Sequence, residues 1–209
     1  MFVEVLPEHV PLHLETLSRS KILEDFYMAG GTGLALQLGH RRSVDLDFFS
    51  LRDIDPSYIA TKVASFGHFA VDSMSSGTLH GLFNGIKISF FNYPYPLIKD
   101  LHNFSGISIA DPVDIGCMKI DAISSRGSCK DFIDLYFICN EIISLREMLE
   151  FFDQKYKGIE YNKVHILKSL VYFNEAEQEP TPLMLKRMVW DEVKEYFINQ
   201  VKDISNEWL

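Results

Sequence analysis

The chain has 209 residues, of which 47% are hydrophobic, and a formal net charge of −9. This length is sufficient to bury a sizeable core, and 16 phenylalanines place the chain among globular rather than disordered proteins. The acidic balance argues against a protein whose main task is non-specific binding of nucleic acid, because such binding draws its affinity from neutralised phosphates. It does not exclude a nucleic-acid substrate.

The apolar runs are too short to span a bilayer, and residues 1–7 lack the basic and apolar regions of a secretory signal. We therefore expect a cytoplasmic protein without membrane contact. The three cysteines show no paired Cys-X-X-Cys spacing, so we expect reduced, mostly buried thiols rather than a zinc or redox site.

Residues 1–111 alternate between helical and strand patterns. Helices are predicted over residues 7–18, 32–38 and 56–66, and strands over residues 26–29, 45–49, 68–73, 78–83, 86–91 and 107–110. Asn84-Gly85 is typical of a hairpin turn. This order predicts a mixed sheet flanked by helices.

Residues 112–209 lack strand signals. Apolar residues recur at helical spacing over residues 112–123, 129–140, 144–156, 162–173 and 181–201. We therefore predict the α+β class with two domains, in which residues 1–111 form the sheet-containing core and residues 112–209 form a carboxy-terminal helical bundle.

The most informative stretch begins with a glycine-rich turn at Gly30, Gly31 and Gly33. These glycines allow a backbone to approach a ligand closely, and the helix that follows from about Thr32 points N–H groups at an anion. Taken alone, such a turn is more often an ordinary connection than a phosphate site. At fixed distance it is followed by Asp-Leu-Asp on an apolar run.

Asp45 and Asp47 alternate on the predicted strand and should emerge on one face. Two carboxylates about 4 Å apart repel by about 4 kcal/mol at an effective dielectric near 20, which favours a cation beside them. Mg²⁺ fits, because it is typically held by one or two carboxylates together with substrate phosphates. The alternative is a solvated strand face, but the turn, helix and acid pair together are typical of polymerase-β-like nucleotidyltransferases.

A second polar block follows on two predicted helices. Lys119 lies on the first, and Lys130, Asp131 and Asp134 lie on the second, with Arg126 between them. Composition alone favours a solvated helix pair with ion pairs worth about 0 to 1 kcal/mol each.

The two blocks together resemble the AbiEii/AbiGii group of bacterial nucleotidyltransferase toxins from abortive-infection systems. The resemblance rests on residues 30–32, 42–49, 114–119 and 126–136, and covers roughly residues 26–140. It implies an α/β-type nucleotidyltransferase fold in which the helical domain completes the active-site cleft.

The resemblance also implies roles for individual residues. Lys119 would contact nucleotide phosphates as a mobile cation, and Asp134 would be a base or a support for the metal site. The implied catalytic residues are Asp45, Asp47, Lys119 and Asp134, with Asp45 and Asp47 as metal ligands. The implied nucleotide-binding residues are Gly30, Gly31, Thr32, Arg42, Ser43 and Lys119.

One departure from the wider superfamily lies in the predicted hairpin. Polymerase-β-like enzymes usually place a third carboxylate on a neighbouring strand, where this chain has Ser89. Either Asp134 supplies the missing charge or the metal site is depleted. The role of Asp131 stays open.

These observations predict an Mg²⁺- or Mn²⁺-dependent enzyme that moves a nucleoside monophosphate from an NTP to an acceptor hydroxyl. The resemblance further implies a toxin of a toxin–antitoxin or phage-defence system, with the 3′ end of tRNA as a candidate acceptor and a separately encoded antitoxin as partner. The alternative is a catalytically degenerate fold that senses nucleotides or binds a protein.

Overall fold

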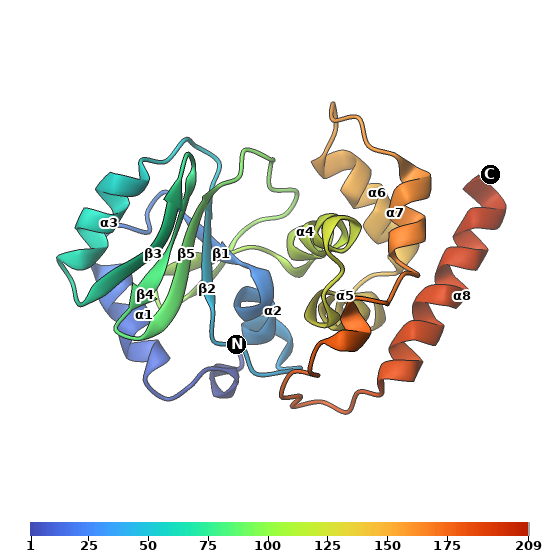
Figure 1. The fold of residues 1–209 in the computed structure, drawn as a ribbon, viewed down its shortest axis with the longest axis horizontal. Coiled ribbons are helices and arrows are strands. Elements are labelled where there is room, and N and C mark those ends of the chain that lie inside the picture. Colours follow the sequence, from blue (N-terminus) through green and yellow to red (C-terminus); the bar gives the residue numbers. More distant parts are fainter. Residues whose placement is uncertain (209) are drawn as a thin grey trace. The chain divides into compact units, whose positions relative to one another are not determined.

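The computed structural model describes residues 1–208, which divide into two compact units between Asp111 and Pro112 (Figure 1). The first unit contains a seven-stranded sheet, and the second contains helices. The predicted α+β class is confirmed. Across residues 1–208, none of the helices combines the length and the apolar character needed to cross a membrane.

The sheet of the first unit has the strand order β3-β4-β5-β2-β1-β7-β6. It is mixed as predicted, since β1 pairs with β7 and β2 with β5 in parallel while the other neighbours are antiparallel. The strands are β1 (Tyr27–Ala29), β2 (Leu46–Ser50), β3 (Phe69–Ser75), β4 (Thr78–Phe83), β5 (Ile86–Asn92), β6 (His102–Phe104) and β7 (Ile107–Ile109). The sequence pattern did not predict β6, a three-residue edge strand.

One face of this sheet forms the core of the first unit. Exposure alternates along β2, so that Leu46 and Phe48 are buried while Asp47 and Phe49 are half-buried on the opposite face. Helices α1 (Val10–Arg19) and α3 (Pro56–Ala64) contribute apolar side chains to the buried face (Figure 1). The predicted alternation therefore separates a packed face from a face that bears the acid.

Helix α2 (Gly30–Leu38) begins two residues earlier than predicted. The glycine pair is thus the first turn of the helix and not a loop before it. Gly30 has a φ of +65°, a left-handed conformation that favours glycine, and Ala29 precedes the helix as its N-cap. The first N–H groups of an α-helix have no partners within the helix, so this turn has donors to offer.

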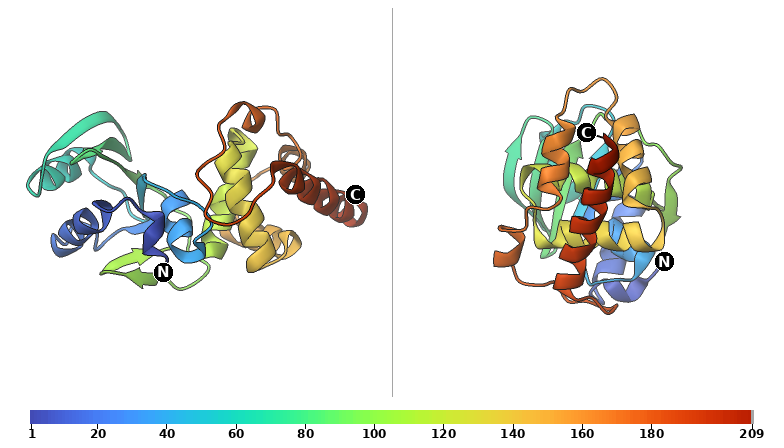
Figure 2. Two further views of the ribbon diagram at one scale, coloured as in Figure 1. Left: turned by 90° about the horizontal axis from the view of Figure 1, so that it is seen from below. Right: turned by 90° about the vertical axis from the view of Figure 1, so that its right-hand side faces the viewer.

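The second unit is helical throughout its regular elements. Its helices are α4 (Pro112–Ser125), α5 (Cys129–Glu141), α6 (Leu145–Lys155), α7 (Lys163–Ser169) and α8 (Trp190–Trp208), with a short 3₁₀ turn at Ala176–Gln178. Ser128 and Ser144 cap α5 and α6 with their hydroxyls. Figure 2 shows α8 lying over the other helices of this unit.

The last predicted helix was wrong over residues 181–189, which precede α8 and are not helical. Pro180 and Pro182 remove backbone donors at its start. Exposure also alternates residue by residue through this segment, as in an extended chain. Helix α7 likewise ends at Ser169, four residues before the predicted end.

All three cysteines lie in α4 and α5 and are buried, as expected. Burial raises the pKa of the Cys117 and Cys139 thiols to about 12. These two side chains therefore stay protonated near neutral pH and behave as apolar core residues.

A fully buried ion pair connects α4 to α6. Lys155 Nζ lies 2.7 Å from Asp114 Oδ1, and both side chains are 0% exposed. Removing one partner leaves an uncompensated buried charge, so we expect Lys155→Ala to lower the free energy of unfolding by about 3–5 kcal/mol in urea titrations. Replacing both partners by apolar residues, as in Asp114→Leu with Lys155→Met, should cost less than the single change.

The matched control is Lys186→Ala, which breaks a partly exposed pair with Glu141 in the same unit. This change should cost within about 1 kcal/mol. Equal losses from Lys155→Ala and Lys186→Ala would contradict the structural role given to the buried pair.

Candidate active site

The glycine turn lies directly against the acidic strand. A Cβ added at Gly30 would lie 2.8 Å from Asp47 Oδ2, which is closer than real Cβ contacts. Only glycine therefore lets this turn approach the carboxylate so closely, both because of the space and because of the positive φ. The first-turn N–H groups of α2 and the Asp47 carboxylate form one site.

Hydrogen bonds hold the segment before β2 against the same turn. The Thr32 hydroxyl donates to the backbone carbonyl of Asp45 at 2.5 Å and lies 2.8 Å from Ser43 Oγ. Thr32 is 1% exposed. Its hydroxyl therefore positions the acidic segment from inside the unit.

A buried arginine completes this arrangement. Arg41 is 3% exposed, and its Nη2 would lie 2.2 Å from a Cβ at Gly31. Its Nη1 donates to the carbonyl of Arg42 at 3.1 Å. Arg42, the predicted site residue, is exposed, whereas Arg41, which the sequence pattern did not single out, has its guanidinium against the glycine turn.

A row of side chains crosses the sheet at the level of Asp47. The register pairs Asp47 with Ala29 on β1 and with Ser89 on β5, and pairs Ser89 with His80 on β4. Paired residues of adjacent strands share a face, so Asp47, Ser89 and His80 lie side by side. No carboxylate stands at the Ser89 position, as the sequence shows.

Aromatic rings form the next row on this face. Phe49 stacks on Tyr27 and on Phe91, with ring centroids 5.9 and 4.9 Å apart, and meets Tyr93 edge-on at 5.5 Å. A row of packed aromatic rings therefore lies next to the row formed by Asp47, Ser89 and His80.

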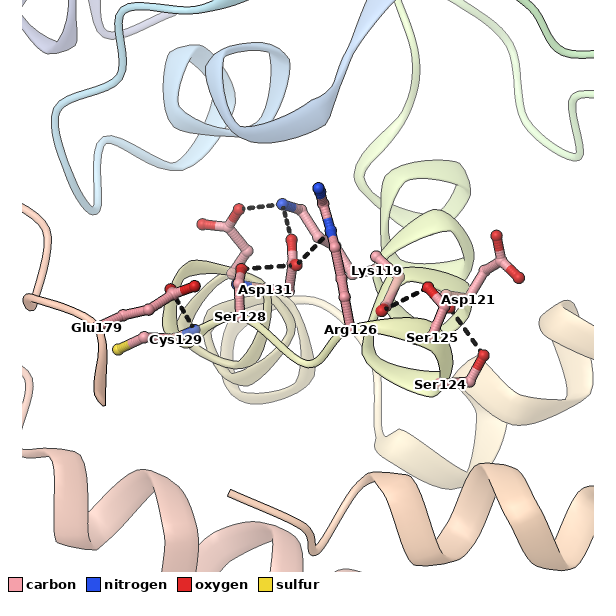
Figure 3. Close-up of polar contacts among 11 residues, drawn as sticks. Lys119, Asp121, Ser124, Ser125, Arg126, Ser128, Cys129, Asp131 and Glu179 are labelled. Atoms are coloured by element: carbon pink, nitrogen blue, oxygen red, sulfur yellow. Dashed lines mark hydrogen bonds and ion pairs between the residues drawn. The ribbon is translucent and has the colours of Figure 1, made fainter. Parts of the chain in front are cut away.

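A second charged cluster lies in the helical unit (Figure 3). Lys119 Nζ lies 2.7 Å from Asp131 Oδ1 and 2.7 Å from Asp134 Oδ2, and the three side chains are 9%, 5% and 0% exposed. Ser128 donates its hydroxyl proton to Asp131 at 2.7 Å, and Arg126 Nε lies 4.0 Å from the same carboxylate. Lys119 on α4 thus forms ion pairs with two aspartates on α5.

The predicted site residues fall into two groups, one in each unit. The first unit brings together Gly30, Gly31, Thr32, Ser43, Asp45 and Asp47, with Arg42 exposed beside them. The second unit brings together Lys119, Asp131 and Asp134. Asp131 lies as close to the Lys119 ammonium as Asp134 does, a point that the sequence pattern left open.

A divalent cation fits the first group only together with a substrate. Among residues 1–208, no group of three or more His, Cys, Asp or Glu side chains is arranged to hold a metal ion. The Asp47 carboxylate lies next to a glycine turn that a Cβ would obstruct, and Asp45 is held by its backbone carbonyl just before β2, outside the strand that the sequence predicted for it. Mg²⁺ accepts one or two carboxylates when phosphates and waters fill its other positions.

Solved structures share this architecture. The chain matches MenT4, a nucleotidyltransferase toxin from Mycobacterium tuberculosis, with a TM-score of 0.59 and 14% identity over 91% of this chain and 83% of that one. It matches JHP933 from Helicobacter pylori with a TM-score of 0.51 and 16% identity over 97% and 94% of the two chains. The fold is that of the nucleotidyltransferases.

Sequence comparison gives the family. Residues 13–80 match the family described as "Nucleotidyl transferase AbiEii toxin, Type IV TA system". The chain is also 40% identical over 195 residues to aq_aa25, an uncharacterized protein of Aquifex aeolicus, covering 91% of this chain and 93% of that one. Residues 13–80 thus match the AbiEii nucleotidyltransferase toxin family, which bears out the resemblance over this part of the chain and supports a nucleotidyltransferase activity.

The contact between Gly30 and Asp47 can be tested with a matched pair of glycines. Gly30→Ala should displace the Asp47 carboxylate and abolish binding of an NTP with Mg²⁺ in calorimetry, in addition to a backbone cost of about 1–2 kcal/mol for the left-handed conformation.

Gly85→Ala is the control, because Gly85 also has a positive φ, of +85°, but nothing lies within 4 Å of an added Cβ. This variant should lose similar stability and keep nucleotide binding. If both variants bound nucleotide equally, the close approach at Gly30 would have no part in the site.

Proposed function

We propose that this protein is an Mg²⁺- or Mn²⁺-dependent enzyme that transfers a nucleoside monophosphate from an NTP to an acceptor hydroxyl. The observation that supports this proposal most directly is the contact of Gly30 with the Asp47 carboxylate. It combines donors for phosphate and a carboxylate for a cation at one point.

The first unit supplies the groups for the triphosphate. In this proposal the backbone N–H groups of Gly30, Gly31 and Thr32 bind the β and γ phosphates, and Arg42 and Ser43 border them. Asp45 and Asp47 hold the divalent cation. When bound, that cation neutralises phosphate charge and aligns the attacking and leaving oxygens.

The helical unit supplies a cation of its own. We assign Lys119 to the phosphates, where it offsets the charge that develops on the leaving pyrophosphate. Asp131 and Asp134 orient its ammonium group from both sides. Because Asp134 is fully buried and paired with Lys119, it suits support of the site better than proton abstraction.

The family match over residues 13–80 supports a proposal for the biological role. The matched family is described as a toxin of a type IV toxin–antitoxin system, and MenT4 is named a nucleotidyltransferase toxin. We propose that this chain acts in the cytoplasm as a toxin in abortive infection or phage defence, with the 3′ end of tRNA as acceptor and a separately encoded antitoxin as partner.

A second candidate function is a catalytically degenerate module that senses nucleotides or binds a protein. Its support is Ser89, which stands beside Asp47 where the wider superfamily has a third acid. Both candidates bind nucleotide, so only turnover separates them.

Asp47→Asn tests the enzymatic proposal. Purified protein is incubated with each labelled NTP, Mg²⁺ or Mn²⁺ and total tRNA, and label in RNA is measured. Loss of the cation-binding carboxylate should lower transfer by at least about 100-fold. Asp100→Asn, at an exposed loop position of the same unit, is the control and should leave transfer unchanged. Absence of transfer by the wild type with every NTP would favour the binding module.

The role of Lys119 can be separated from its contribution to stability by comparison with Lys155. Each is a buried lysine of the second unit that lies 2.7 Å from an aspartate, so Lys119→Met and Lys155→Met should both lower the unfolding midpoint. Only Lys119→Met should also raise the KM for the NTP, by about tenfold to a hundredfold, and lower kcat, because it removes a charged hydrogen bond to phosphate and the cation that offsets charge on the leaving pyrophosphate.

Both variants are assayed well below their unfolding midpoints, with KM taken from initial rates. Parallel changes in KM for the two variants would assign Lys119 a purely structural role.

A further inference from the structure

We propose that Ser89 and His80 form a proton-accepting pair that takes the place of the third carboxylate in this enzyme. The inference rests on the proposed function and assigns two further residues to the same site. From the sequence alone, Ser89 stands only where a third carboxylate is expected, and no role is predicted for His80.

The position of the pair follows from the register of the sheet. Ser89 on β5 is the direct neighbour of Asp47 on β2, and His80 on β4 is the direct neighbour of Ser89. Strands of one sheet lie about 4.8 Å apart, so the serine hydroxyl is the first polar group beside the acid on this face. Its position suits contact with an acceptor hydroxyl above Asp47.

The chemistry of the pair follows from one hydrogen bond. His80 Nδ1 lies 3.0 Å from Ser89 Oγ, and both side chains are half-buried. The Phe91 ring meets the imidazole edge-on at 5.3 Å and restricts its rotation. With His80 protonated only on Nε2, the serine hydroxyl donates to Nδ1 and leaves its own lone pairs to accept.

The charged groups around the imidazole are few. Lys87 lies on the same face of β5, two residues from Ser89, and Asp47 lies across Ser89 on β2. Asp72 lies at the irregularity in β3 opposite His80, where Ser73 pairs with His80. One lysine and two aspartates therefore face the pair from the neighbouring strands.

The proton transfer balances without any further reactant. The acceptor oxygen forms a bond to the α phosphorus, and the bond from that phosphorus to pyrophosphate breaks with its electron pair on the leaving group. The acceptor proton passes to Ser89 Oγ as the serine proton passes to His80 Nδ1. His80 later returns its proton to solvent.

The other acid that could serve this purpose is less suited to it. Asp134 is 0% exposed, and its carboxylate lies 2.7 Å from the Lys119 ammonium. An adjacent positive charge disfavours uptake of a proton by a carboxylate. A neutral imidazole can take up a proton near neutral pH.

The test combines loss with rescue. His80→Ala and Ser89→Ala should each lower kcat by about 10²–10⁴-fold, while calorimetry shows unchanged affinity for the NTP with Mg²⁺. Adding Ser89→Asp to His80→Ala restores a carboxylate at the third-acid position. This double variant should recover kcat to within about tenfold of the wild type.

The pH dependence of kcat gives a readout that a merely structural role would not change. The pH dependence of kcat should differ between the wild type and the double variant, because an imidazole and a carboxylate are different proton acceptors. His68→Ala, which removes an exposed histidine just before β3, is the control. This variant should keep the wild-type kcat and its pH dependence.

The inference is overturned if His80→Ala retains the wild-type kcat, or if the double variant stays as slow as His80→Ala. Failure of the proposed function is a different result, in which the wild type itself transfers no nucleotide. Circular dichroism on each variant establishes that the folded protein is being compared.

Discussion

The site depends on the approach of a helix to an acidic strand at a distance that only glycine permits. Gly30 places the first turn of α2 against the Asp47 carboxylate, with a backbone conformation that other residues rarely adopt. The N–H groups of that turn attract anions, whereas the carboxylate repels them. A divalent cation between the carboxylate and a phosphate would make the two compatible, which is why the proposed function places a metal-bound triphosphate at this contact.

In the helical unit, by contrast, charged side chains are buried together with partners of opposite charge. Asp114 and Lys155 are completely excluded from solvent. Lys119 has two aspartates and retains slight exposure. Burying a charged group costs free energy unless a partner of opposite charge lies within hydrogen-bonding distance. The two aspartates therefore hold the Lys119 ammonium group in a fixed position.

The sequence predicted most of the fold because its signals were local. Strand alternation placed Asp47 opposite Phe48, and the Asn84-Gly85 turn located the β4–β5 hairpin within one residue. The extended segment before α8 does not form the predicted helix, because Pro180 and Pro182 disfavour a helix there although apolar residues recur at helical spacing. Arg41 and His80 were missed for another reason. Their importance comes from register and close approach between strands and turns, which residue spacing along the chain does not encode.

The net charge of −9 raises the question of how an acidic protein binds a triphosphate. Long-range attraction cannot do it, since the overall field repels anions. The affinity must come from short-range groups, which operate within a few ångströms and outweigh a screened surface field. The first-turn N–H groups of α2 are such groups, and the proposed cation at Asp47 would be another. Under the proposed function the divalent cation would arrive with the nucleotide, because the complex of NTP with Mg²⁺ meets less repulsion than the free NTP.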